Sequence, residues 1–127
     1  SRNVLELHGS VHRNHCQRCG KFYGLEHILR TEGVPRCSCG GIIKPDVVLY
    51  EEGLDQRTLE ASVRYLAEAD MLIIGGTSLV VYPAAGLVND YRGNKLTLIN
   101  KGATSMDWQA DLVVSGPIGE ILGAVQI

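Results

Sequence analysis

The sequence predicts an α/β fold: part of a doubly wound parallel sheet, with a small inserted zinc-ribbon module. Two observations predict this fold. From residue 55 onward, hydrophobic periodicity gives the order helix, strand, helix, strand, strand, helix, which favours parallel strand pairing. Ahead of residue 45, all four cysteines fall in two close pairs, a pattern typical of a structural zinc site. Three strands are few for an open sheet with two covered faces, so we expect partner strands upstream.

Composition limits the class of protein. The 127 residues have the length of one domain, or of one domain with a small insert, and 45% hydrophobic residues suffice for a core. A formal net charge of −2 argues against direct nucleic-acid binding, and the few aromatic residues form no stacking platform. The first residues lack a signal peptide and start without methionine, so we expect a processed or truncated chain. If its cysteines are reduced, the protein is cytoplasmic.

A histidine near the start of the chain is a candidate catalytic residue. Val4–Leu7 alternates and predicts a strand already under way, and His8 and Gly9 follow directly. This order places the imidazole at a strand end with little side-chain bulk behind it. An imidazole exchanges protons near neutral pH and therefore suits a general base. A histidine that merely packs or hydrogen-bonds at the surface is the other interpretation of the same residues.

The metal site is predicted from cysteine spacing. Cys16 and Cys19 form a CxxC pair, Cys37 and Cys39 form a CxC pair, and 17 residues separate the two pairs. Four thiolates complete the tetrahedral shell of one Zn²⁺ ion, which leaves no open position and makes the site structural. Disulfides are the competing interpretation, but nothing marks the chain as secreted.

Short elements are predicted around the cysteines. His12 and His15 lie near the first pair and could replace a ligand, but four sulfurs make this unnecessary. Apolar residues at helical spacing within Tyr23–Thr31 predict a short helix or a ribbon arm. The run Asp46–Tyr50 predicts a strand whose exposed edge could pair with an extended peptide. A plain core strand that ends in a loop explains this run equally well.

The centre of the chain predicts a helix, a strand and a turn. Asp55–Ala69 is amphipathic, with Asp55 as candidate N-cap. Met71–Val88 follows without a charge and has the length of a membrane span, but its glycines and proline break it, so we reject a span. We expect a strand over Met71–Ile74 and then a turn over residues 75–78 at the carboxyl edge of the sheet, where ligands bind. An ordinary core strand and turn is the alternative.

Four further elements complete the predicted fold. They are a helix over Ala84–Tyr91, a strand over Leu96–Asn100, a strand over Ala110–Val114 and a helix over Pro117–Val125. The second of these ends on a polar side chain at the carboxyl edge of the sheet, which adds a candidate ligand contact there.

Taken together, the motifs resemble the sirtuin family of NAD-dependent protein deacylases. The resemblance rests on the order and spacing of five pieces that run through nearly the whole chain. These pieces are Glu6–Ser10, the four-cysteine module, Pro45–Tyr50, Gly76–Ala85 and Leu98–Asn100. The resemblance implies a Rossmann-like domain and an enzyme that removes the acyl group from acyl-lysine in proteins. NAD is then the co-substrate, and nicotinamide and O-acyl-ADP-ribose are the products.

The resemblance also implies a role for each matching residue. His8 is implied as the catalytic base, which helps to deprotonate a ribose hydroxyl after the acyl oxygen has displaced nicotinamide. The implied zinc ligands are Cys16, Cys19, Cys37 and Cys39. The implied NAD contacts are Gly76, Thr77 and Ser78 along the ribose and phosphates, and Asn100 at the adenine ribose. The implied contacts of the acyl-lysine peptide are Val48, Leu49, Tyr50 and Val80. Relatives commonly carry Gly-Glu where this chain has Glu51-Glu52.

The segments that begin members of this family are absent from the sequence: the glycine-rich NAD loop, the Asp-Phe-Arg segment and the Gln-Asn-Ile-Asp segment. We therefore expect a carboxyl-terminal part that needs its amino-terminal half as partner and is inactive alone. Its expected divisions are residues 1–14 with the His-Gly motif, the zinc module 15–44 and the NAD-binding part 45–127. A catalytically silent nucleotide-binding sensor and a protein-binding zinc-ribbon module are the alternative functions.

Overall fold

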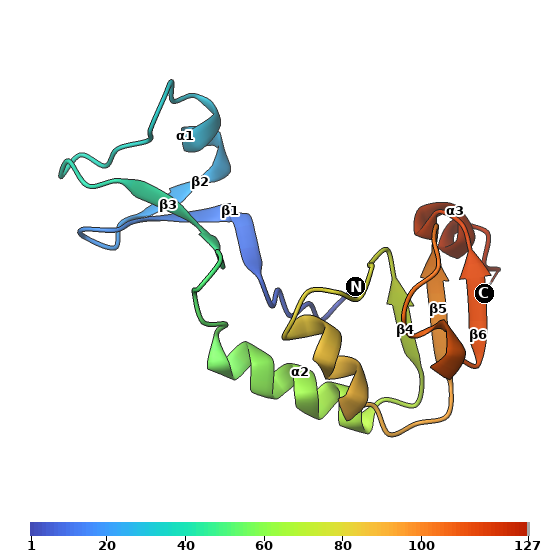
Figure 1. Cartoon of the computed structure of the whole chain (residues 1–127). Helices are drawn as coiled ribbons and strands as arrows, with labels where there is room; N and C mark the ends of the chain where they lie inside the picture. The colour runs from blue at the N-terminus through green and yellow to red at the C-terminus, as the bar shows by residue number, and fades with distance from the viewer. Residues whose placement is uncertain (127) are drawn as a thin grey trace. The chain divides into compact units, whose positions relative to one another are not determined.

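The computed structural model describes residues 1–126 and contains two compact units, Ser1–Leu59 and Glu60–Ile127 (Figure 1). Each unit has its own three-stranded sheet. Compactness places one boundary after Leu59, and the division at residues 14 and 44 stays a prediction. Within residues 1–126, no helix is both long and apolar enough to cross a membrane.

The first unit is an antiparallel sheet with a short helix. Its strands are β1 (Gly9–Cys16), β2 (Phe22–Gly24) and β3 (Ile43–Val47), in the order β2-β1-β3, and its helix is α1 (Leu25–Leu29). The small core of this unit contains Cys16, Cys37 and Ile43, with Tyr23 and Ile28 packed against them. Two of the three buried residues in this core are cysteines, so the core and the candidate metal site share the same residues.

Two predicted strands of the first unit are displaced. Val4–Leu7 is not a strand: Leu7 N–H donates to Leu5 O at 3.1 Å and Gly9 N–H to Glu6 O at 2.8 Å, so the backbone turns before β1. The strand expected over Asp46–Tyr50 begins at Ile43 and ends at Val47. Pro45 is tolerated inside it because β1 changes register between Ser10 and Asn14, where a missing N–H breaks no regular ladder.

The second unit is a parallel sheet, as predicted. Its strands are β4 (Leu72–Gly75), β5 (Leu96–Asn100) and β6 (Leu112–Ser115), in the order β4-β5-β6. Helix α3 (Ile118–Gly123) and the 3₁₀ helix η2 (Asp107–Gln109) flank the last strand. Strand β5 lies in the middle, and its Leu98 is 1% exposed. The predicted strand over Leu96–Asn100 is confirmed, while the neighbouring predictions miss by one or two residues.

The helix α2 (Gln56–Glu68) spans the boundary between the units and has the predicted start. Asp55 Oδ1 accepts hydrogen bonds from the backbone N–H and the hydroxyl of Thr58, each at 2.8 Å, which is the N-cap arrangement. The helix predicted over Ala84–Tyr91 is instead the 3₁₀ helix η1 (Ala84–Asp90). Gly86 lies inside it and donates to Pro83 O at 3.0 Å, and a glycine there weakens a regular α-helix.

Candidate functional site

The four cysteines meet at one point of the first unit. Their sulfur atoms all lie within 4.8 Å of one another, with Cys16 Sγ 3.5 Å from Cys39 Sγ and Cys19 Sγ 3.6 Å from Cys37 Sγ. These distances exceed the S–S bond length of about 2.05 Å, so the cysteines are free. Four sulfurs at this spacing fit the tetrahedral shell of a zinc ion.

Glycines let the two cysteine loops close around this cluster. Gly20 has a φ of 71° and Gly40 a φ of 82°, in the left-handed region that glycine adopts without steric cost. Gly20 N–H donates to Cys16 O at 2.9 Å and Gly40 N–H to Cys37 O at 2.8 Å. Each cysteine pair therefore lies on a tight turn that directs its two sulfurs to the same side.

Hydrogen bonds give the thiols unequal acidity. Cys39 N–H and the Tyr23 hydroxyl, 3.0 Å from Cys37 Sγ, donate to that sulfur and lower the pKa of Cys37 to about 5. Lys21 N–H lowers the pKa of Cys19, but the three neighbouring thiols outweigh it and raise that pKa to about 12. Because four thiolates this close repel one another, they ionise together only around a cation. The donor set therefore fits a zinc ion, which would complete that ionisation.

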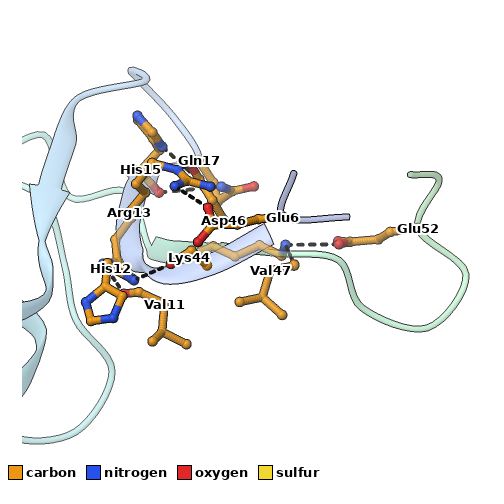
Figure 2. A network of polar contacts seen from close by, with 12 residues as sticks. Glu6, Val11, His12, Arg13, His15, Gln17, Lys44, Asp46, Val47 and Glu52 are labelled. Carbon is orange, nitrogen blue, oxygen red and sulfur yellow. Dashed lines mark hydrogen bonds and ion pairs between the residues drawn. The ribbon is translucent and has the colours of Figure 1, made fainter. Parts of the chain in front are cut away.

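The nearby histidines take other roles. His15 Nδ1 lies 2.7 Å from Asp46 Oδ1, which joins β1 to β3 beside the cluster (Figure 2). Arg13 pairs with two carboxylates: its Nε lies 3.7 Å from Asp46 Oδ2, and its Nη1 lies 2.6 Å from Glu6 Oε2. Within residues 1–126, the potential metal ligands that lie close enough to share one ion are the four cysteines, and His12 and His15 are not among them. The four-sulfur prediction is thus the one the geometry favours.

The candidate base His8 lies in the turn just before β1, not at the end of a preceding strand. Its side chain is exposed, and its carbonyl accepts the Val48 N–H at 3.0 Å. Gly9 has a φ of 77°, and a Cβ there would lie 1.7 Å from Asp46 O. Only glycine permits this close approach of β1 to β3 at position 9. Gly9 therefore allows the preceding residue, His8, to lie beside Val48.

The carboxyl edge of the parallel sheet carries a cavity of about 420 Å³. Its lining residues are Gly76, Asn100, Lys101, Gly116, Pro117, Ile118 and Gly119. Two residues predicted from separate motifs, Gly76 and Asn100, are brought together here. Gly76 N–H donates to Ile99 O at 3.1 Å, so this glycine supplies space rather than a free donor. The Lys101 ammonium brings a positive charge to the lining, which suits a phosphate-bearing ligand.

Other predicted residues lie outside this cavity lining. Thr77 Oγ1 accepts the Leu79 N–H at 3.1 Å, and Ser78 is exposed in the same turn. Lys101 and residues 116–119 were not predicted as ligand contacts. The signal for them was the Gly-Pro pair directly after β6, because the carboxyl ends of neighbouring parallel strands share one edge.

The residues expected at the acyl-lysine peptide are mostly exposed. Tyr50 is fully exposed and Leu49 is 54% exposed just after β3, whereas Val48 is half-buried. Val80, in the second unit, is 68% exposed. Leu49 and Tyr50 therefore form a short exposed apolar stretch of the first unit, and Val80 is an exposed apolar residue of the second.

Comparison with known proteins finds a matching family and similar proteins for this chain. The profile described as "Sir2 family" matches residues 1–83. An "NAD-dependent protein deacetylase" of Clostridium acetobutylicum is 60% identical over 127 residues, covering 98% of this chain and 52% of that protein. The protein of the same name from Clostridium perfringens is 58% identical, with the same coverage. The solved structure "Sir2-p53 peptide-NAD+" is 38% identical with a TM-score of 0.84, covering 95% of this chain and 53% of its own. The chain thus spans about half the length of the curated relatives it matches.

Proposed function

This chain belongs to the Sir2 family, and we propose that it is the carboxyl-terminal part of an NAD-dependent protein lysine deacylase. The reaction removes the acyl group from acyl-lysine and yields nicotinamide and O-acyl-ADP-ribose. The observation that carries the proposal is the 60% identity to the deacetylase of Clostridium acetobutylicum over 98% of the chain. The solved structure "Sir2-p53 peptide-NAD+" supports NAD and a peptide as the two substrates.

His8 is the proposed catalytic base. NAD, when bound, would supply an electrophilic ribose carbon from which the acyl oxygen displaces nicotinamide. His8 would then accept a proton from a ribose hydroxyl. Its exposed ring is accessible to a ligand, and its backbone is fixed by the Val48 N–H at 3.0 Å and by the close approach at Gly9. A base must reach the proton that it removes, and a rigid backbone keeps the ring in place for this.

The nucleotide is proposed to bind at the carboxyl edge of the parallel sheet. Gly76, Thr77 and Ser78 face the ribose and phosphates in this proposal, and Asn100 the adenine ribose. The cavity of about 420 Å³ that includes Gly76, Asn100 and Lys101 supports it. A ligand at this edge follows the general rule for open parallel sheets.

The acyl-lysine peptide is proposed to contact Val48, Leu49, Tyr50 and Val80. Support comes from the exposed apolar side chains of Leu49 and Tyr50, and from the extended course of the backbone at the end of β3.

Zinc has a structural role in this proposal. Cys16, Cys19, Cys37 and Cys39 would hold one ion and leave it without an open position for chemistry. Reduced cysteines also fit a cytoplasmic enzyme.

The amino-terminal half of the same fold is the proposed partner of this chain. The chain spans 52% of its first curated relative, and its parallel sheet leaves Ile73 48% and Val113 45% exposed. Parallel sheets are normally covered on both faces, so further protein is needed to complete this one. We therefore expect the isolated chain to be inactive.

Mass spectrometry of the reaction products tests the proposal. An acetyl-lysine peptide and NAD are incubated with this chain alone and with the chain joined to the amino-terminal half of a Clostridium relative. The joined protein should yield deacetylated peptide and O-acetyl-ADP-ribose in equal amounts, and the isolated chain neither. Robust turnover by the isolated chain would refute the need for a partner. Nucleotide binding without turnover in the joined protein would favour the silent sensor.

A further inference from the structure

A closed turn follows β3, inside the segment proposed to contact the acyl-lysine peptide. Glu52 N–H donates to Leu49 O at 3.1 Å, and the Glu52 carboxylate accepts the Leu49 N–H at 2.9 Å. The turn over residues 49–52 is thus closed twice, once by backbone and once by side chain. Glu51 has a φ of 70° at its third position, where a type II turn requires a positive φ and favours glycine. A second closure offsets the strain of a glutamate there.

Lys44 ties the same carboxylate to β3. Its Nζ donates to Val47 O at 2.9 Å and to Glu52 Oε2 at 3.0 Å (Figure 2). The Leu49 N–H and then the Lys44 ammonium hold the pKa of Glu52 below its ordinary value, so this carboxylate is ionised at neutral pH. One oxygen, Glu52 Oε2, therefore accepts from both the strand and the loop beyond it.

The directions of the Val48 and Leu49 N–H groups show which part of the backbone the Glu52 carboxylate holds. The Val48 N–H points toward β1, where it donates to His8 O at 3.0 Å. Because the N–H groups of successive residues in an extended segment point to opposite edges, the Leu49 N–H points away from β1. Without the Glu52 carboxylate, the Leu49 N–H would lose its acceptor and Lys44 would keep only Val47 O. The backbone bond from Glu52 N–H to Leu49 O would then be the remaining closure of the turn.

We propose that Glu52 is a positioning residue for the acyl-lysine peptide: through Leu49 and Lys44 it fixes the backbone of Val48–Tyr50 before the peptide binds. This inference rests on the proposed function. A binding segment that is ordered in advance loses less conformational entropy on association, so the peptide binds more tightly. Glu52 takes no part in the chemistry in this account, and its effect falls on peptide affinity.

Kinetics and peptide binding of the joined protein test this role. Glu52→Ala should raise the KM and the Kd for an acetyl-lysine peptide about tenfold, the size expected for losing a charge-assisted hydrogen bond. The kcat should stay within about twofold, and the KM for NAD should not change, because the chemistry and the nucleotide contacts remain. Glu52→Gln should lose less than Glu52→Ala, since its amide oxygen still accepts from Leu49. Lys44→Met should lose affinity in the same direction.

Glu32→Gln is the matched control, because Glu32 is exposed in the same unit and outside both proposed sites. It should match the wild type, and zinc content and melting temperature should show that each variant is folded. An unchanged or lower peptide Kd in folded Glu52→Ala would overturn the inference, since Glu52 would then be neutral or compete with the peptide. A wild type that binds the peptide without turnover defeats the proposed function, while the Kd comparison still decides the role of Glu52. A wild type that does not bind the peptide overturns both.

Discussion

The two units hold candidate sites that are complete to different degrees. The zinc site of the first unit has its four ligands between residues 16 and 39, with all sulfurs within 4.8 Å. The cavity of the second unit lies at the edge of a sheet that still exposes Ile73 and Val113. A metal site within one short segment forms with that segment, whereas a ligand site at a sheet edge needs the rest of the sheet. The first site should therefore be testable in this chain, and the second only with a partner.

The largest effect is expected from Cys37→Ala. Removal of one of four ligands should abolish stoichiometric zinc binding and unfold the first unit, because structural zinc contributes about 10–16 kcal/mol in small metal-dependent folds. Metal analysis and circular dichroism check this. His12→Ala, close to the first cysteine pair, should keep its zinc and its fold. A Cys37→Ala variant with one bound zinc and an unchanged melting temperature would contradict the structural four-cysteine site.

A matched pair of glycine substitutions compares the two units directly. A Cβ at Gly9 would lie 1.7 Å from the backbone oxygen of Asp46, whereas one at Gly75 would lie 2.0 Å from the end of the Ile118 side chain. Backbone cannot move aside as a side chain can. Urea unfolding should show a loss of about 3 kcal/mol for Gly9→Ala and about 1 kcal/mol for Gly75→Ala. Equal losses, or the reverse order, would show that the two sheets differ less in rigidity than their contacts indicate.

The smallest effect is expected at the cap of α2, the helix between the two sites. The Thr58 hydroxyl and then the Thr58 N–H lower the pKa of Asp55 below its ordinary value of 3.8. A lowered pKa in the folded state means that the cap stabilises fully above pH 3.8, and that this stabilisation is lost as pH falls through the folded pKa. Asp55→Ala should lower the melting temperature slightly at pH 7 and not at about pH 2. Asp55→Asn, which keeps the acceptor, should lose less, and identical melts for all three proteins would exclude a role for the cap.

The sequence predicted the features that depend on neighbouring residues. The cysteine spacing defined the metal cluster, the buried run Leu96–Asn100 became β5, and Asp55 caps α2 through a residue three positions away. The cap and each cysteine pair depend on a spacing of a few residues, and β5 on continuous burial, which can be read locally. The two cysteine pairs lie 17 residues apart, but their shared need for one metal ion predicts that they meet.

Features that depend on distant segments were missed or displaced. Val4–Leu7 alternates like a strand but turns instead, because alternation does not supply a pairing partner. The boundaries of β3 follow its pairing with β1, including the irregular register that accepts Pro45. Lys101 and residues 116–119 join the cavity only because parallel pairing aligns the ends of β5 and β6. The turn over residues 49–52 likewise depends on Lys44, eight residues before Glu52.

Nicotinamide release by the joined protein, compared with its His8→Ala variant, tests the central claim most directly. The reaction contains NAD and an acetyl-lysine peptide, and NAD binding is measured on both proteins. We predict release by the wild type and a loss of at least about 100-fold in the variant with unchanged NAD affinity, the size expected for a catalytic base. Equal release by the two proteins would contradict the assignment of His8. An absence of release from a wild type that is folded and loaded with zinc would contradict the deacylase function.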